Sequence, residues 1–139
     1  MNSFEALHQL RDIAKADDFS SACSDLVERW EAGGVTPSVV SPILRFMREN
    51  PELDFGSPGS LVHLVEKFYR RGYEESLIES VQKVATPHTV WMLNRLINGA
   101  DSPREKTYLV SILKSVTRSE IASPEARDVA AQFLELHSS

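Results

Sequence analysis

The sequence predicts an all-α protein, and three patterns lead to this prediction. Apolar residues recur at intervals of three and four along nearly the whole chain of 139 residues. Five of the Ser-Pro and Thr-Pro pairs each precede one of these amphipathic runs. Such pairs are typical of helix starts, because a hydroxyl side chain caps the first turn and proline suits the first helical position. No stretch alternates apolar and polar residues over the length of a β-strand.

Three helices are expected before residue 50. The first has an apolar stripe from Phe4 to Ala14, and the second has one from Phe19 to Trp30 and ends at the Gly33-Gly34 pair. The third follows Thr36-Pro37, with a stripe over residues 39–47. Residues 49–56 contain an Asn-Pro pair and a glycine and are therefore expected to form a loop.

Five more helices are expected in the remainder of the chain. The fourth follows Ser57-Pro58 and stops at Gly72, and the other four have apolar stripes ordered by the same spacing. Three of the starts are marked by Thr86-Pro87, Ser102-Pro103 and Ser123-Pro124. The stripes of the last five helices lie within residues 61–68, 77–84, 90–97, 108–116 and 126–134.

Short connections, mostly of two to six residues, make consecutive helices antiparallel neighbours. About eight antiparallel helices in one domain over residues 1–139 fit two architectures. A HEAT-like α-solenoid stack of helical hairpins is preferred, and a closed helical bundle is the alternative.

The charge is unevenly distributed. Residues 1–56 carry ten acidic and five basic side chains, whereas residues 57–139 carry ten of each, so the net charge of −5 lies entirely in the first part. An acidic surface disfavours nucleic acid and anionic membranes, because binding to phosphates requires Lys and Arg. It favours a basic protein partner. The alternative is that a charge of −5 only keeps a small protein soluble.

The sequence offers no recognisable catalytic or metal-binding motif. The four histidines lack partners at ligand spacing, and Cys23 has no basic neighbour close in sequence that would activate its thiol. We therefore expect a non-enzymatic protein without cofactor or metal. With no apolar run of membrane-spanning length, no secretory signal and a single cysteine, we also expect a cytoplasmic location.

The stretch TPHTVWMLNRLING contains two asparagines at helical spacing, Asn94 and Asn98. Asparagine is unfavourable inside helices, so these residues need a reason. They either bond to neighbouring backbone and fix helix packing, or present a recognition surface together with Trp91 and Arg95. The first explanation, in which the asparagines fix helix packing, is favoured.

Three segments in the middle of the chain resemble a family of bacterial immunity proteins. They are FGSPGSLVHLVEKFY at residues 55–69, YEESLIES at 73–80 and TPHTVWMLNRLIN at 86–98. The family consists of antidotes encoded beside polymorphic toxins, such as the contact-dependent inhibition and Rhs-type effectors. The resemblance covers about residues 55–113, under half of the chain. It implies an all-helical, often HEAT-like, cytoplasmic protein that binds one toxin domain and blocks it, and it transfers no contact residue.

We therefore expect an immunity protein whose partner is the C-terminal domain of a toxin encoded by the adjacent upstream gene. The alternative is a HEAT-like adaptor that binds a peptide or helix of another protein. The expected contact surface consists of acidic residues of the first part of the chain, extended by one tyrosine and two glutamates. These residues are Asp17, Asp18, Glu28, Glu31, Glu52 and Asp54, with Tyr73, Glu74 and Glu75 as the extension.

Overall fold

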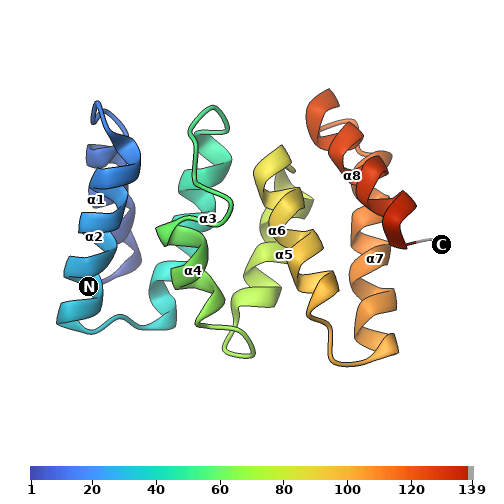
Figure 1. The fold of residues 1–139 in the computed structure, drawn as a ribbon, viewed down its shortest axis with the longest axis horizontal. Coiled ribbons are helices and arrows are strands. Elements are labelled where there is room, and N and C mark those ends of the chain that lie inside the picture. The colour runs from blue at the N-terminus through green and yellow to red at the C-terminus, as the bar shows by residue number, and fades with distance from the viewer. Residues whose placement is uncertain (138–139) are drawn as a thin grey trace. The chain divides into compact units, whose positions relative to one another are not determined.

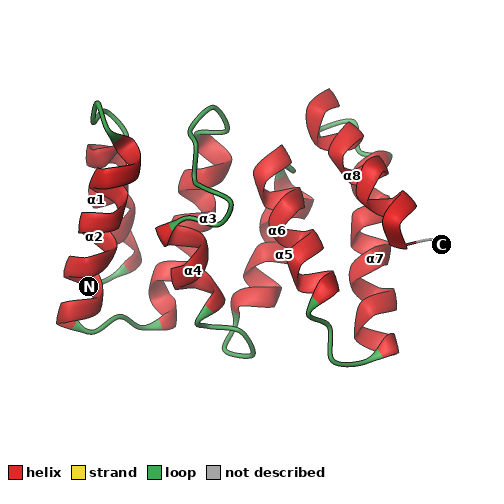
Figure 2. Cartoon of the chain, viewed as in Figure 1, coloured by secondary structure: helices red, strands yellow, loops and turns green. Residues whose placement is uncertain are grey.

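The computed structural model describes residues 1–137, and all regular structure in that range is helical (Figures 1 and 2). The all-α prediction is confirmed, whereas the preference for a HEAT-like stack over a bundle stays a prediction. The helices are α1 (Ser3–Ile13), α2 (Phe19–Gly33), α3 (Val40–Glu49), α4 (Ser60–Glu66), α5 (Tyr73–Lys83), α6 (Pro87–Asn98), α7 (Pro103–Thr117) and α8 (Pro124–His137), with a short 3-10 helix, η1 (Pro37–Val39), before α3.

The chain divides into two compact units. The first covers Met1–Ser76 and the second begins at Leu77. The sequence predicts one domain that contains both units, and this remains a prediction. The charge follows the same division, because residues 1–76 carry 13 acidic and 8 basic side chains whereas residues 77–139 carry 7 of each.

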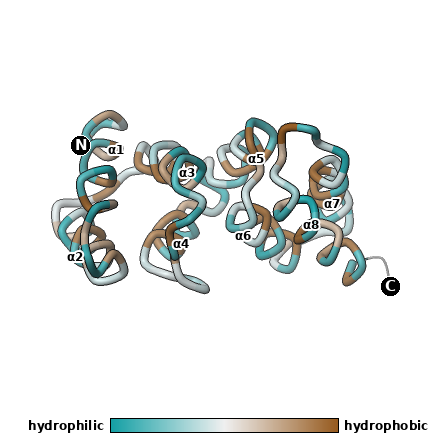
Figure 3. Tube along the Cα trace, turned by 90° about the horizontal axis from the view of Figure 1, so that it is seen from above, coloured by the Kyte–Doolittle hydropathy of each residue, from teal (hydrophilic) through white to brown (hydrophobic). Residues whose placement is uncertain are grey.

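The first unit contains two helical hairpins, α1 with α2 and α3 with α4. Helix α1 packs beside α3, and α2 packs beside α4, so that the four helices form two layers (Figure 3). The core between the layers is aliphatic with a cluster of three phenylalanines, in which Phe19 of α2 lies edge-on to Phe55 at a centroid distance of 5.8 Å. The largest fully buried side chains of this unit are Leu10, Leu26, Ile43, Leu44, Phe46, Met47, Leu61, Leu64 and Tyr73.

In the second unit, α6, α7 and α8 pack against one another. Helix α8 turns two alanines, Ala126 and Ala130, toward the core, and both are completely buried. Small side chains allow a close approach of helices, and α6, whose Met92 and Leu93 lie in the core, packs beside α8. Both of these side chains are also completely buried.

Side-chain caps explain where most helices begin. Thr86, Ser102 and Ser123 each accept a hydrogen bond from the backbone N–H three residues later, at 3.1 to 3.3 Å. At α6 the cap is reciprocal, because Thr89 in turn accepts from the backbone N–H of Thr86 at 3.1 Å. Thr36 caps η1, which leads directly into α3. Four of the five expected helix starts are thus confirmed.

The fifth expected start, Ser57-Pro58, is wrong. Helix α4 begins at Ser60, and Gly59 is its N-cap residue. A tight turn precedes the helix, since a Cβ atom on Gly56 would lie 2.6 Å from the Cα of Gly59, and one on Gly59 would clash with the carbonyl oxygen of Phe55. Only glycine fits at both positions, so the turn delays the helix by two residues.

Three side chains expected on apolar stripes lie exposed instead. Phe4 is 79% exposed in the first turn of α1, and Val84 lies beyond the last residue of α5. Tyr108 lies at the margin of the stripe of α7, beside the buried Leu109, and is 54% exposed. Each lies at a helix end or stripe edge, where packing neighbours are few.

Candidate protein interface

Helix α2 and the loop before it concentrate the negative charge of the chain. Residues 16–34 contain five acidic side chains and a single basic one, Arg29, so this segment carries −4 of the net charge of −5. All five acidic side chains are exposed. We call these residues the acidic α2 face; they are Asp17, Asp18, Asp25, Glu28 and Glu31.

Three of the acidic residues share one side of α2 because of their spacing. A helix turns about 100° per residue, so Asp18, Asp25 and Glu28 project in similar directions. The buried Cys23, Val27 and Trp30 project to the opposite side, toward the core of the first unit. Burial of the apolar side therefore fixes the exposure of the acidic side.

Two members of the acidic α2 face have structural partners. Asp18 is the N-cap of α2 and accepts a hydrogen bond from the backbone N–H of Ser21 at 3.1 Å. Glu31 forms an ion pair with Lys67, which lies just beyond α4. In the described part of the chain, the side chains of Asp17, Asp25 and Glu28 make no hydrogen bond or ion pair. Their charges thus face solvent without a partner in the described chain.

The loop between α3 and α4 lies at the same end of the first unit as the loop before α2 (Figure 1). The ring contact between Phe19 and Phe55 holds this loop against the start of α2. Glu52 and Asp54 are exposed in the loop, and Asp54 accepts a hydrogen bond from the backbone N–H of Gly56 at 2.8 Å. The structure therefore gathers Glu52 and Asp54 with the acidic residues that begin α2.

The predicted extension through residues 73–75 is only partly supported by exposure. The prediction for Tyr73 as a contact residue is wrong, because its side chain is completely buried at the start of α5. Glu74 is half-buried, and its carboxylate accepts from the backbone N–H of Arg70 at 2.9 and 3.0 Å. Glu75 is exposed.

Glu49 is acidic but belongs to the framework of the first unit. Its carboxylate accepts from Arg11 of α1 at 2.8 Å and from Arg45 of α3 at 3.0 Å, which ties α1 to α3. Slight burial raises the pKa of Glu49, but the hydrogen bonds and charges of Arg11 and Arg45 outweigh it and hold the pKa below its ordinary value.

The single cysteine, Cys23, is buried in the first unit. Burial raises the pKa of the Cys23 thiol to about 11, which leaves almost no nucleophilic thiolate at neutral pH. Residues 1–137 contain no group of three or more His, Cys, Asp and Glu side chains that could hold a metal ion. A search of the same residues found no helix of the length and apolar character that crossing a membrane requires.

The two asparagines of α6 have different surroundings. Asn94 is buried, and its Oδ1 lies 2.6 Å from Nε2 of His137 on α8, so this side chain joins two helices. Asn98 is exposed at the end of the helix. Trp91 is half-buried, with the guanidinium of Arg95 5.2 Å from its ring centroid.

Asp25 is the member of the acidic α2 face that was not predicted from the sequence. It stands alone in sequence, without an acidic neighbour or a turn motif. Its spacing of seven residues from Asp18 and three from Glu28 would have placed it on the same side of the helix.

A comparison with models of known protein families found no match, and searches of curated proteins and of solved structures found none either. The resemblance to immunity proteins therefore stays a prediction from the sequence.

Proposed function

We propose that this protein is an immunity protein that neutralises one bacterial toxin domain by direct binding, and that the acidic α2 face is its contact surface. The observation that carries the proposal is the concentration of −4 of the net charge on α2 and the loop before it, with the other side of α2 packed in the core. The resemblance over residues 55–113 supplies the class of partner.

Electrostatics support this assignment of the surface. A toxin that acts on nucleic acid or another anionic substrate has a basic groove, and an acidic helix fits such a groove and excludes the substrate. Exposed charges that lack ion pairs steer the encounter, because their field extends to about 8–10 Å at physiological ionic strength. Asp17, Asp25 and Glu28 meet this condition.

The partner in this proposal is the C-terminal toxin domain encoded by the adjacent upstream gene, and the complex forms in the cytoplasm of the producing cell. Titration calorimetry of that domain against this protein tests the function. We expect a 1:1 complex with a Kd in the nanomolar range or below, together with protection of cells that express the toxin domain. Absence of heat and of protection would contradict the proposal for that pair.

The loop acids provide a second test of the surface. Glu52→Lys with Asp54→Lys places two positive charges beside the start of α2 and is expected to weaken binding and its dependence on salt. An unchanged affinity and salt dependence would remove the α3–α4 loop from the contact surface. The assignment of the acidic α2 face, which contains neither residue, would not be affected by that result.

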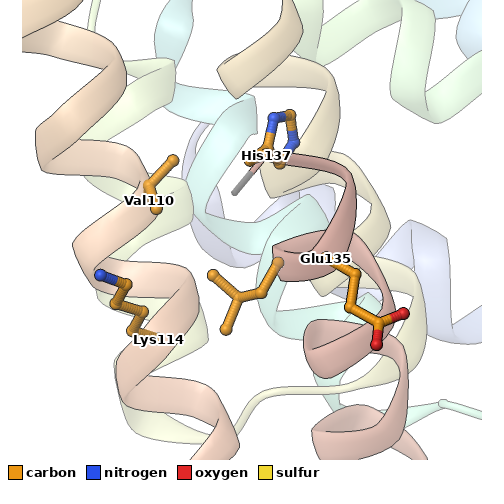
Figure 4. Close-up of a pocket in the computed structure, with 5 residues that line it drawn as sticks. Val110, Lys114, Glu135 and His137 are labelled. Atoms are coloured by element: carbon orange, nitrogen blue, oxygen red, sulfur yellow. The ribbon is translucent and has the colours of Figure 1, made fainter. Parts of the chain in front are cut away.

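A second function, that of an adaptor for a helix of another protein, is supported by one feature of the second unit. Helices α7 and α8 enclose an open apolar hollow of about 250 Å³ (Figure 4). An adaptor gene need not follow a toxin gene, so gene order distinguishes the two functions.

A further inference from the structure

The hollow between α7 and α8 has one wall from each helix. Val110 and Lys114, one helical turn apart, line the α7 wall, and Leu134, Glu135 and His137 line the α8 wall (Figure 4). Val110 and Leu134 are half-buried, so the apolar surface between the walls is reachable from solvent. The volume of about 250 Å³ is enough for one large apolar side chain.

The shape of the hollow is set by packing within the second unit. The last turn of α8 is held against α6 by the contact of 2.6 Å between His137 Nε2 and Asn94 Oδ1. Antiparallel packing of α7 on α8 supplies the other wall. The groove between two such helices accepts a row of side chains from a third helix, in the way that ridges fit grooves in helix packing.

The rim of the hollow carries opposite charges on its two sides. Lys114 projects from α7 and Glu135 from α8, with the apolar surface between them (Figure 4). Both side chains are exposed, and within the described chain Lys114 makes no ion pair. A ligand that matches this rim has a negative charge on one flank and a positive charge on the other.

We propose that this hollow is a docking site for an amphipathic helix of another protein. The helix inserts one large apolar side chain between Val110 and Leu134, with a carboxylate next to Lys114 and a cation next to Glu135. The site belongs to the second unit and uses none of the residues of the acidic α2 face. It therefore does not depend on the toxin partner.

A designed peptide provides the probe. It is a helix of about 18 residues, long enough to be partly helical alone, with leucines on one face, glutamates along one flank of that face and lysines along the other. A second peptide carries glutamine in place of every glutamate. We expect the first peptide to shift the ¹⁵N amide resonances of α7 and the end of α8, and to bind more tightly than the second.

Charge exchange at the rim tests the mode of binding. Lys114→Glu alone is expected to weaken binding of the first peptide about fivefold. This is the size of effect expected when one exposed ion pair is replaced by a repulsion. Lys114→Glu combined with Glu135→Lys restores the affinity, because the peptide can lie in the opposite direction and match the exchanged flanks. The matched control is Glu79→Lys with Lys83→Glu, which exchanges an exposed ion pair on α5 and leaves the affinity unchanged.

Three results would overturn the proposal. The first is an absence of resonance shifts at α7 and α8 up to millimolar peptide. The second is a loss of affinity in the double exchange as large as in Lys114→Glu alone. The third is a shift of the same resonances with protein concentration in the absence of peptide, which would assign the hollow to a second copy of this chain. Circular dichroism of each variant confirms that the fold is kept.

Discussion

Replacement of Gln9 by leucine is expected to weaken the contact between α1 and α2 that holds the buried side of α2 in place. Gln9 of α1 accepts a hydrogen bond at 2.7 Å from the indole Nε1–H of Trp30. Trp30 lies on the buried side of α2 and is only 6% exposed. Leucine has a similar size but no acceptor, so the indole N–H loses its partner while the packing volume is nearly kept.

The size of the effect follows from the burial of the two groups. A fully buried donor without a partner costs about 1–3 kcal/mol. Gln9 is half-buried, so water reaches part of this site and the lower end, about 1 kcal/mol, applies. For a chain of this size, that corresponds to a decrease in Tm of about 3–4 °C.

Urea unfolding followed by circular dichroism measures this change. A double-mutant cycle with Trp30→Phe isolates the hydrogen bond from the loss of ring area, and we expect a coupling energy of about 1 kcal/mol. Coupling indistinguishable from zero would refute the assignment of this bond as the tie between α1 and α2. Toxin binding by Gln9→Leu should equal that of the wild type under conditions where both are folded, since the acidic side is untouched.

Two further predictions concern titratable groups. The lowered pKa of Glu49 means that its ion pairs stabilise the folded state fully above the ordinary pKa of 4.5, and that this contribution is lost as the pH falls through the folded-state pKa. Glu49→Gln should therefore unfold more easily than the wild type at pH 7, with a difference that shrinks in acid titrations. A difference that persists at pH 2 would contradict this. Because the pKa of Cys23 is about 11, only about one thiol in a thousand is ionised at pH 8, so its reaction with a disulfide reagent should be slow until the protein unfolds. Fast reaction of the folded protein would show that the thiol is accessible and activated.

The sequence predicted the helices well where the start signals are local. Thr86, Ser102 and Ser123 cap their own helices, so their effect does not depend on distant parts of the chain. The start of α4 could not be predicted in the same way. It depends on the close approach of Gly59 to the backbone of Phe55, which only the folded turn reveals.

The sequence predicts the acidic composition of the candidate site but not the arrangement of its residues. The excess of acidic residues near the N-terminus is visible in the sequence, and the structure places most of it on α2 and the loop before it. Tyr73 is predicted on the surface but is completely buried, because the sequence alone does not report which aromatic side chains enter the core. The hollow between α7 and α8 arises from the packing of two helices, which no local pattern in either helix encodes.

The most direct test of the proposed acidic interface compares two charge-matched variants in association kinetics with the upstream toxin domain. Asp25→Lys with Glu28→Lys alters the acidic α2 face, whereas Glu120→Lys with Asp128→Lys changes the net charge equally through exposed acidic residues of the second unit. We expect the first variant to associate about tenfold more slowly than the wild type at low salt and to lose most of its dependence on ionic strength. The second variant should stay within about twofold of the wild type. Equal slowing of both variants would show that only net charge matters, and would contradict the assignment of the acidic α2 face as the contact surface.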